Sequence, residues 1–427
     1  MGDYRIRIVD KILEKKLQSK GAVLIEGPKW CGKTTTAEEV SCSKVMLARA
    51  DEKERFRNLL EVDVDTALSG NPPMLIDEWQ TVPKLWDAVR WMVDKRKSMG
   101  QFILTGSAVP NKEGEKEIFH SGTGRFAWIT MRPMTLFESG ESNGLVSLEN
   151  LFSTPEKILE KSSLNLQDIA FLICRGGWPI AVDLPKDIAL EQAFDYYDAV
   201  TKEDIIRIDG VKRTSEKVQR LMRAYARHQG SQVSIATLKS DLKNNDQTSL
   251  DDDTISSYIE ALRKIFVVED LAAWNPNLRS KTAIRTTDTR YFVDPSIATA
   301  ALGLGPNDLI NDLNTMGLFF ETMCIRDLRV FAEALNGKVY HYRDKSGLEC
   351  DAVIHLRDGR YGLIEIKLGG ETLINEGAKT LTALANQIDT TRMKTPSFCM
   401  VLTAVGDYAY RRPQDGVYVV PIGCLKD

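Results

Sequence analysis

Residues 27–34 carry the stretch GPKWCGKT, in which two glycines are separated by four residues and followed by Lys-Thr. The apolar run 22–25 before it predicts a short buried strand, and residues 34–40 can begin a helix. Gly27 and Gly32 allow backbone angles and a close approach that a Cβ atom would block, so N–H groups can point at phosphate oxygens. The stretch therefore predicts a cradle for nucleotide phosphates at a strand-to-helix turn.

The ligand predicted for this P-loop is ATP with Mg²⁺. Lys33 would reach the β- and γ-phosphates, and Thr34 would ligate the Mg²⁺ ion. The alternative is a glycine-containing turn that binds no ligand, but the strand before and the helix after it favour a phosphate site. The residues of this segment predicted to bind the nucleotide are Gly27, Pro28, Lys29, Trp30, Cys31, Gly32, Lys33, Thr34 and Thr35.

The length and composition of the chain limit the classes of protein to which it can belong. The chain has 427 residues, which predicts two or three domains because single hydrophobic cores rarely grow further. Its net charge of −4 argues against a surface that binds polyanions everywhere. The seven cysteines are scattered, so neither a disulfide framework nor a zinc site is predicted. The sequence shows no membrane helix and no signal peptide, which predicts a cytoplasmic protein without a membrane partner.

Two acidic residues follow the third apolar run of the chain. Short apolar runs alternate with helical patterns here, which predicts a mostly parallel sheet flanked by helices. Asp77 and Glu78 come directly after the run 74–76, so we expect both at the same sheet edge as the P-loop. Asp77 would hold Mg²⁺ directly or through water, and Glu78 would polarise the attacking water. An acid pair on a surface loop is the alternative.

Small hydroxyl residues follow the next apolar run, at 102–104. Ser107 is predicted to orient water or bond the γ-phosphate, with Thr105 in reserve and a capping role for Thr105 as the alternative. Arg125 precedes the run 126–131 and could reach the nucleotide of a neighbouring subunit. A solvated arginine is the equal alternative at this point.

These segments resemble a family of bacterial and archaeal AAA+ ATPases with an AAA_14 core and a DUF4143 C-terminal region. The resemblance covers most of the chain and rests on GPKWCGKT, LIDEWQTVPKLWDAVRWMVD, LTGSA, GRFAWITMRPMTLFE, FVDPSIA and LIEIKL. It implies an ATPase that assembles as a homo-oligomer. It also implies that Arg125 occupies the usual position of an arginine finger, with Arg132 as the fallback.

The middle of the chain predicts a connector followed by helices. Residues 139–144 are polar and contain glycine, which is typical of a linker. The stretch GGWPI at 176–180 ends a helical pattern with a rigid break. It is similar to the GxP element of related signalling ATPases, which implies that Pro179 lies against the nucleotide and reports its state. An ordinary helix terminator is the alternative.

Three helical patterns between residues 215 and 265, and an apolar run at 267–271, have the layout of a winged helix-turn-helix. The third pattern, at 254–265, would read DNA. It offers Arg263 and Lys264 among acidic residues, so its electrostatic footprint for DNA is weak. We therefore favour a structural or protein-docking role over DNA reading.

The last part of the chain predicts an αβββαβ order, with a helix at 318–330, strands at 338–342, 350–356 and 361–368, a helix at 375–386 and a strand at 397–402. Glu365 and Lys367 fall on one face of the third strand, because alternate residues of a strand share a face. Polar residues inside the apolar stretch LIEIKL would be costly unless they form a site.

This order resembles the PD-(D/E)xK nuclease superfamily, a restriction-endonuclease-like fold. The resemblance implies that Asp351 and Glu365 bind Mg²⁺ or Mn²⁺. It implies that Lys367 orients the hydroxide or steadies the phosphate, and that Glu321 is an auxiliary acid on the preceding helix. Cys350 stands where many members have proline. An ion pair on an edge strand and an inactive relative that keeps the fold are the alternatives.

The whole sequence predicts an α/β protein with four parts. These are an AAA+ P-loop ATPase core at 1–140, a helical lid at 141–213, a winged-helix-like domain at 214–300 and a nuclease-like domain at 301–427. We expect an ATP-hydrolysing enzyme whose ATP state is coupled to a C-terminal domain that acts on or binds DNA. The alternative is a nucleotide-dependent signalling or scaffold switch, similar to STAND proteins, with an inactive nuclease-like domain.

Overall fold

The computed structural model describes residues 4–107, 118–153, 158–207, 213–245, 250–276 and 284–427. The chain forms two compact units. The first unit comprises Met1–Pro133, Ala199–Ser215 and Tyr258–Val267, and the second comprises Met134–Asp198, Glu216–Ser257 and Val268–Asp427. The four domain boundaries expected from the sequence stay a prediction.

A parallel five-stranded sheet lies at the centre of the first unit, with the strand order β2-β3-β4-β1-β5. Its strands are β1 (Ala22–Glu26), β2 (Ser43–Met46), β3 (Met74–Asp77), β4 (Phe102–Gly106) and β5 (Phe126–Thr130). The predicted α/β fold with a parallel sheet is therefore confirmed. Because the strands are parallel, the residues that follow β1, β3 and β4 share one edge of the sheet.

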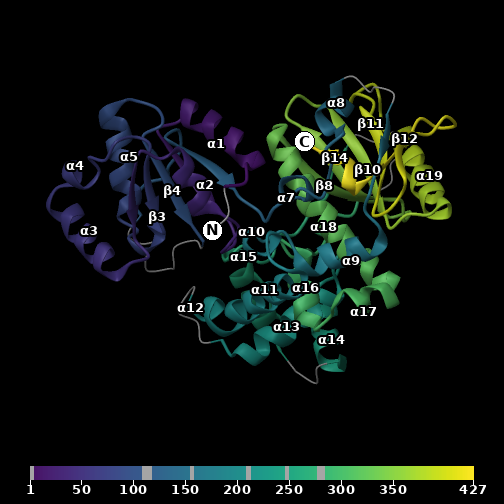
Figure 1. Cartoon of the computed structure of the whole chain (residues 1–427), viewed down its shortest axis with the longest axis horizontal. Helices are drawn as coiled ribbons and strands as arrows, with labels where there is room; N and C mark the ends of the chain where they lie inside the picture. The colour runs from purple at the N-terminus through teal and green to yellow at the C-terminus, as the bar shows by residue number, and fades with distance from the viewer. Residues whose placement is uncertain (1–3, 108–117, 154–157, 208–212, 246–249, 277–283) are drawn as a thin grey trace. The chain divides into compact units, whose positions relative to one another are not determined.

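Helices cover both faces of this sheet, as Figure 1 shows in purple and blue. They are α1 (Ile8–Ser19), α2 (Lys33–Val40), α3 (Ala50–Val62), α4 (Val64–Ala67), η1 (Trp79–Thr81) and α5 (Leu85–Arg96). Successive side chains of β1 point to opposite faces of the sheet. Val23 packs with Leu13 of α1 on one face, and Leu24 packs with Val89 of α5 on the other. The strand is thus buried on both sides, as expected of a central parallel strand.

The middle of the chain is mainly helical. Its elements are α7 (Leu136–Ser139), β6 (Val146–Ser147), α8 (Leu148–Ser153), β7 (Leu159–Lys161), α9 (Leu166–Arg175), α10 (Pro179–Val182), α11 (Lys186–Ala199), the π-helix η2 (Val200–Asp204), α12 (Ile205–Arg207), α13 (Ser215–Arg227), α14 (Ile235–Asn245), α15 (Asp252–Lys264), α16 (Pro295–Leu302) and α17 (Pro306–Asn311). Helices α13, α14 and α15 coincide with the three helical patterns between residues 215 and 265.

The strand expected at 267–271 is reduced to isolated bridges. Val268 pairs with Phe292, and Leu271 pairs with Thr289. Phe266 adopts a left-handed conformation with φ of 58° directly before this segment. The chain turns there at the end of α15, so the segment begins as a turn and makes these bridges without forming a regular strand.

A seven-stranded sheet forms the C-terminal part of the second unit, in the order β7-β12-β13-β11-β10-β9-β8. The elements are α18 (Leu313–Ala334), β8 (Gly337–Arg343), β9 (Glu349–Leu356), β10 (Tyr361–Lys367), α19 (Glu371–Gln387), β11 (Phe398–Thr403), β12 (Tyr408–Arg411), β13 (Tyr418–Pro421), η3 (Ile422–Cys424) and β14 (Leu425–Lys426). The predicted αβββαβ order is present from α18 to β11.

Residues 139–144, which we interpreted as a linker, are bound to the end of the chain. The Ser142 hydroxyl donates to the Leu425 carbonyl at 2.7 Å, and the Asn143 N–H donates to the Gly423 carbonyl at 2.9 Å. Strand β6 then pairs with β14. The polar atoms that suggested a solvated linker have backbone partners instead.

Candidate functional site

The P-loop joins the end of β1 to the start of α2. Gly27 has φ of 153°, and a Cβ atom there would lie 2.1 Å from the Met131 carbonyl oxygen. Gly32, the N-cap of α2, has φ of 105°. Both positions therefore require glycine, one for the close approach of two backbones and one for the left-handed turn into the helix. The N-terminus of α2 is positioned to receive an anion.

Lys33 is held inside this loop. Its side chain is buried, and Nζ donates to the carbonyls of Gly27 at 2.9 Å and Pro28 at 2.7 Å. Both acceptors are neutral, so the positive charge of the ammonium is not cancelled by them. The arrangement suits a lysine that binds phosphate oxygens.

Asp77 lies at the carboxyl end of β3 and is 5% exposed. Its Oδ1 atom accepts hydrogen bonds from the hydroxyls of Thr34 at 2.7 Å and Thr105 at 2.6 Å. Strand register places Thr105 opposite Asp77. The structure thus brings together the predicted metal ligands Thr34 and Asp77, and these hard oxygen atoms fit Mg²⁺.

Glu78 has an unusual backbone conformation, with φ of 56° and ψ of 44°. Such left-handed conformations of non-glycine residues cost about 1–3 kcal/mol and cluster at functional sites. The carboxylate accepts from the Ser107 hydroxyl at 3.0 and 3.1 Å and from the Gln80 side-chain amide. Sequence reasoning missed Gln80, although it lies two residues after Glu78 in the same acidic segment.

Arg125 lies at the opposite edge of the sheet from the P-loop. Its carbonyl accepts from the N–H of Ala22, at the beginning of β1. Its guanidinium forms a two-point pair with Asp94, at 2.9 and 3.2 Å. Arg125 therefore does not reach the P-loop of its own chain, and its role toward a neighbouring subunit stays a prediction. The fallback, Arg132, follows the carboxyl end of β5.

Arg7 is a P-loop contact that the sequence did not reveal. The side chain is buried, and its two terminal nitrogens donate to the carbonyls of Cys31 and Arg132, each at 2.9 Å. It joins the P-loop to the segment that follows β5. No motif surrounds Arg7, so only the fold identifies this contact.

The predicted acid and lysine residues of the C-terminal domain lie on neighbouring strands. Lys367 Nζ lies 2.7 Å from Glu365 Oε2 and 3.3 Å from Asp351 Oδ2. The same Asp351 oxygen accepts from the N–H of Ile366 at 2.7 Å. Asp351 on β9 and Glu365 on β10 are thus bridged by one ammonium group, as Lys367 extends between them.

Burial dominates the electrostatics of this acid-lysine site. It raises the pKa of Glu365 well above the usual range, and the nearby Asp351 raises it further. Burial, followed by the charge of Asp351, also raises the pKa of Glu321 on α18 to about 8. The Tyr291 hydroxyl donates to Glu321. Sequence reasoning missed Tyr291, which lies thirty residues before Glu321 and directly precedes the quoted segment FVDPSIA.

The same site offers oxygen ligands for Mg²⁺ or Mn²⁺. Glu365 Oε1 is buried and has no hydrogen-bond partner among the described residues. Carboxylate oxygens are suitable ligands for both ions. However, within the described ranges no group of three or more His, Cys, Asp or Glu residues is spaced to hold a metal ion. The carboxylates of Asp351 and Glu365 are thus of the right chemical type for such an ion, and the Oε1 atom of Glu365 is among the unpartnered atoms. Their predicted roles as metal ligands stay predictions.

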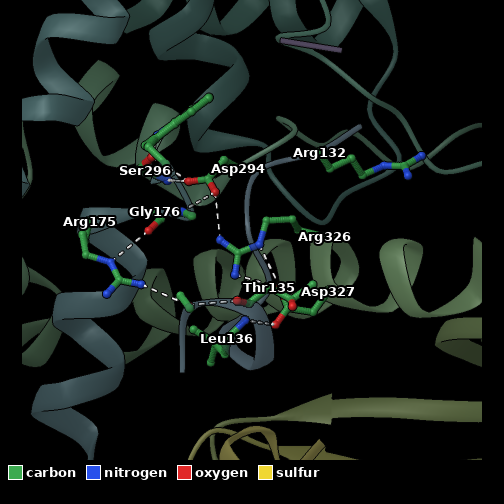
Figure 2. Close-up of polar contacts among 12 residues, drawn as sticks. Arg132, Thr135, Leu136, Arg175, Gly176, Asp294, Ser296, Arg326 and Asp327 are labelled. Atoms are coloured by element: carbon green, nitrogen blue, oxygen red, sulfur yellow. Dashed lines mark hydrogen bonds and ion pairs between the residues drawn. The ribbon is translucent and has the colours of Figure 1, made fainter. Parts of the chain in front are cut away.

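A third charged cluster surrounds Arg326 and is shown in Figure 2. Arg326 is 2% exposed. Its guanidinium donates to Asp294 at 2.8 Å and to Asp327 at 2.8 Å. Asp327 in turn accepts from the N–H of Leu136 at 2.9 Å, and Asp294 accepts from the N–H of Gly177 at 3.0 Å. The cluster therefore fixes two distant backbone segments.

Gly177 of the GGWP stretch is needed for this packing. A Cβ atom on Gly177 would lie 2.2 Å from the Met134 carbonyl oxygen. Pro179 is the first residue of α10 in the second unit. The stretch thus has a structural role in the second unit, and the predicted contact of Pro179 with nucleotide stays a prediction.

Helix α15 carries the basic residues considered for DNA reading. Arg263 pairs with Glu260 of the same helix at 3.5 Å, so its charge is partly countered. Asp252, at the other end of the helix, pairs with Lys239 of α14 at 2.8 Å. Neither contact tests DNA reading, which stays a prediction beside protein docking.

Comparison with known families identifies the parts of the chain. The family model of the AAA domain AAA_14 matches residues 19–139, and the model of DUF4143, a domain of unknown function, matches residues 316–425. The chain thus carries an AAA domain and a DUF4143 domain, and this prediction is confirmed. A further domain of unknown function, DUF8612, matches residues 166–308.

The chain is also similar to two uncharacterized proteins and, at lower identity, to proteins of known structure. The uncharacterized proteins Mb2031c of Mycobacterium bovis and Rv2008c of Mycobacterium tuberculosis are each 24% identical over 356 residues, which cover 83% of this chain and 72% of theirs. The Walker-type ATPase PABY2304 of Pyrococcus abyssi is 13% identical with a TM-score of 0.42, over 69% of this chain and 94% of that one. The ORC2 protein of Aeropyrum pernix is 11% identical with a TM-score of 0.28, and the match covers 72% of this chain and 90% of that one.

Proposed function

We propose that this protein hydrolyses ATP at the P-loop and that its ATP state controls a C-terminal domain that cleaves DNA. The observation that supports the ATPase part is the contact of Thr34 and Thr105 with Asp77, next to the buried Lys33. A bound Mg²⁺ ion would neutralise charge on the β- and γ-phosphates. The AAA domain supplies the fold for this reaction.

Each residue of the P-loop edge has a distinct task in the proposed reaction. Lys33 binds phosphate oxygens, and Thr34 and Asp77 hold the metal ion. Glu78 orients the attacking water and accepts its proton, while Ser107 keeps the carboxylate in place. Catalysis is thus mainly positioning and charge stabilisation.

Arg125 extends the proposal to an assembly. Because it lies at the far edge of the sheet in its own chain, it can act only on a neighbouring subunit's nucleotide. Its exposed guanidinium, which is 40% accessible and paired with Asp94, can exchange that partner for a phosphate oxygen. We therefore propose a homo-oligomer as the hydrolysing form.

Phosphate release from ATP tests the ATPase. We expect Glu78→Gln to bind ATP but to lose about 100-fold or more in turnover, because the carboxylate that activates water is removed. Asp51→Asn is the control, since Asp51 forms an exposed pair with Arg49 in the same unit. Turnover of Glu78→Gln equal to that of the wild type would refute the assignment.

The DNA-cleaving part is supported by the acid-lysine site on β9 and β10. Asp351 and Glu365 would hold Mg²⁺ or Mn²⁺, which polarises the phosphodiester, and Lys367 would stabilise the charge on the attacked phosphate. Incubation with linear, nicked and branched DNA tests this part. We expect Asp351→Ala to abolish cleavage, whereas Asp358→Asn, at the exposed turn between β9 and β10, keeps it.

One observation favours a second function, that of a nucleotide-dependent switch or scaffold with an inactive nuclease-like domain. Lys367 bridges Asp351 and Glu365, so one ammonium group already offsets part of the negative charge of this site. Calorimetric titration with Mn²⁺ separates the two functions: binding that is lost in Glu365→Gln supports the nuclease, and no binding to the wild type supports the switch. For either function we propose a cytoplasmic location, which suits seven free cysteines.

A further inference from the structure

The P-loop makes an ion pair with a residue far along the chain. Lys29 Nζ lies 2.5 Å from Oδ1 of Asp204, the last residue of the π-helix η2. The side chain of Lys29 is 48% exposed and that of Asp204 is 13% exposed. The lysine can therefore leave this partner for a ligand in solution, while the carboxylate is held more firmly by its surroundings.

The segment that carries Asp204 belongs to the same compact unit as the P-loop. Residues Ala199–Ser215 join the first unit, although the chain on both sides of them belongs to the second. Thr201 and Ile205 are fully buried on either side of Asp204. Arg213 donates to the Ile205 carbonyl at 3.3 Å and lies over the Tyr258 ring at 5.4 Å. These contacts anchor the segment beside the P-loop.

The covalent connections of this segment lead into the second unit. Helix α11 ends at Ala199, and α13 begins at Ser215. A change at Asp204 therefore acts on a segment between two helices of the other unit. A π-helix is a rare structure that often marks a functional position, and here it places the carboxylate against a P-loop lysine.

ATP phosphates and Asp204 are competing partners for Lys29. A lysine ammonium is a point charge on a flexible stem, so it can turn from one anion to another. The triphosphate carries more negative charge than one carboxylate, and Lys29 lies within the loop that would surround it. Binding of ATP would then break the ion pair and release η2.

We infer that Asp204 is a positioning residue of the nucleotide site: it holds Lys29 away from the phosphates in the ATP-free protein, and ATP takes Lys29 from it and frees residues 200–206. This inference rests on the proposed ATP binding. It gives the P-loop a direct route by which the nucleotide state reaches the chain between α11 and α13.

Nucleotide affinity tests the competition. Asp204→Asn is expected to lower the Kd for ATP about two- to fivefold, because the energy of one partly exposed ion pair no longer opposes binding. Lys29→Gln is expected to raise the Kd, and adding Asp204→Asn to it is expected to change nothing further. Asp204→Glu keeps the negative charge, so its Kd for ATP is expected to be close to that of the wild type. Asp51→Asn is the matched control for the loss of one carboxylate in this unit.

Hydrogen exchange of the full chain gives the second readout. ATP is expected to speed exchange of the amides of residues 200–206 in the wild type. In Lys29→Gln these amides are expected to exchange rapidly before ATP is added. An unchanged or higher Kd for Asp204→Asn, or slower exchange at 200–206 with ATP, would overturn this inference while the ATP site stands. Failure of the wild type to bind ATP at all would overturn both this inference and the proposed function.

Discussion

Two lysines, the buried Lys33 of the first unit and the partly exposed Lys367 of the second, have opposite kinds of partner. Lys33 donates to two neutral carbonyls of the P-loop, whereas Lys367 lies between the carboxylates of Glu365 and Asp351. A lysine held by neutral groups keeps a positive charge for an anionic ligand. A lysine held by carboxylates already has anionic partners within its own site.

The acids of the two sites differ in the same way. Asp77 accepts hydrogen bonds from hydroxyls, which leave its negative charge available to a cation. Glu365 is paired with Lys367, and burial raises its pKa. The P-loop edge therefore keeps a lysine and an aspartate whose charges have neutral partners, whereas the lysine and the acids of the C-terminal site are paired with one another.

The largest expected effect concerns the lysine of the P-loop. Lys33→Ala should lower ATP hydrolysis about 100- to 1000-fold, because the cation that stabilises the charge of the transferring phosphoryl group is removed. Phosphate release at saturating ATP measures it. A loss smaller than about tenfold would mean that Lys33 is held by its carbonyls for structure alone, and the contrast with Lys367 would disappear.

The next effect concerns stability, for which the substitution of Lys367 is expected to cost more than that of Lys33. Lys367→Met should lower the free energy of unfolding by about 3–5 kcal/mol, because the buried carboxylate of Glu365 and the partly exposed carboxylate of Asp351 lose their cation. Lys33→Met should cost only about 1–2 kcal/mol, since it leaves two carbonyls without a donor. Urea unfolding of the two variants provides the measurement. Equal losses would contradict the assigned partners.

The Arg326 cluster also has two acids, Asp294 and Asp327, around one cation. The dependence of stability on pH tests how the charges of this cluster are balanced. Burial raises the pKa of Asp327 to about 6, although Arg326 opposes this. A raised folded-state pKa gives stability that is present below the ordinary value of about 3.9 and lost as the pH rises through about 6. Asp327→Asn should therefore gain up to about 3 kcal/mol relative to the wild type between pH 4 and pH 7.

Urea unfolding at a series of pH values checks this expectation. Asp94→Asn is the control, because Asp94 is an exposed partner of Arg125 whose pKa is lowered by that arginine. A stability difference between Asp327→Asn and the wild type that stays constant with pH would show that Asp327 is fully ionised beside Arg326.

The smallest effect concerns the hydroxyl partners of Asp77. Thr105→Val should cost about 1 kcal/mol of stability, because one hydrogen bond to a buried carboxylate is lost. Hydrolysis of ATP should fall by about tenfold or less, since Thr34 still contacts Asp77. If Thr105→Val were as inactive as Lys33→Ala, Thr105 would take a direct part in the reaction.

Local patterns predicted the parts of the molecule that local physics controls. The apolar runs before Gly27 and Asp77 predicted strands β1 and β3 of the parallel sheet, and the alternation around Glu365 predicted the strand that carries the acid and the lysine. The P-loop turn and the period of a strand depend on neighbouring residues only.

The contacts that join distant segments could not be predicted in this way. Arg7 binds the carbonyl of Cys31, Asp204 pairs with Lys29, and Tyr291 donates to Glu321. None of these partners has a fixed spacing in the sequence, so their meeting depends on how the chain packs. The same limit applies to residues 139–144, whose polar character suggested a linker until their backbone partners near Gly423 were known.

The control of the C-terminal site by the P-loop is the central claim, and one measurement tests it directly. Cleavage or binding of a labelled DNA duplex is followed in Mg²⁺ with and without a non-hydrolysable ATP analogue, for the wild type and for Lys33→Ala. We expect the analogue to change the wild-type rate or affinity at least about fivefold, an effect of about 1 kcal/mol that is typical of coupled sites, and to have no effect on Lys33→Ala. DNA cleavage or binding by the wild type that is the same with and without the analogue would contradict the claim.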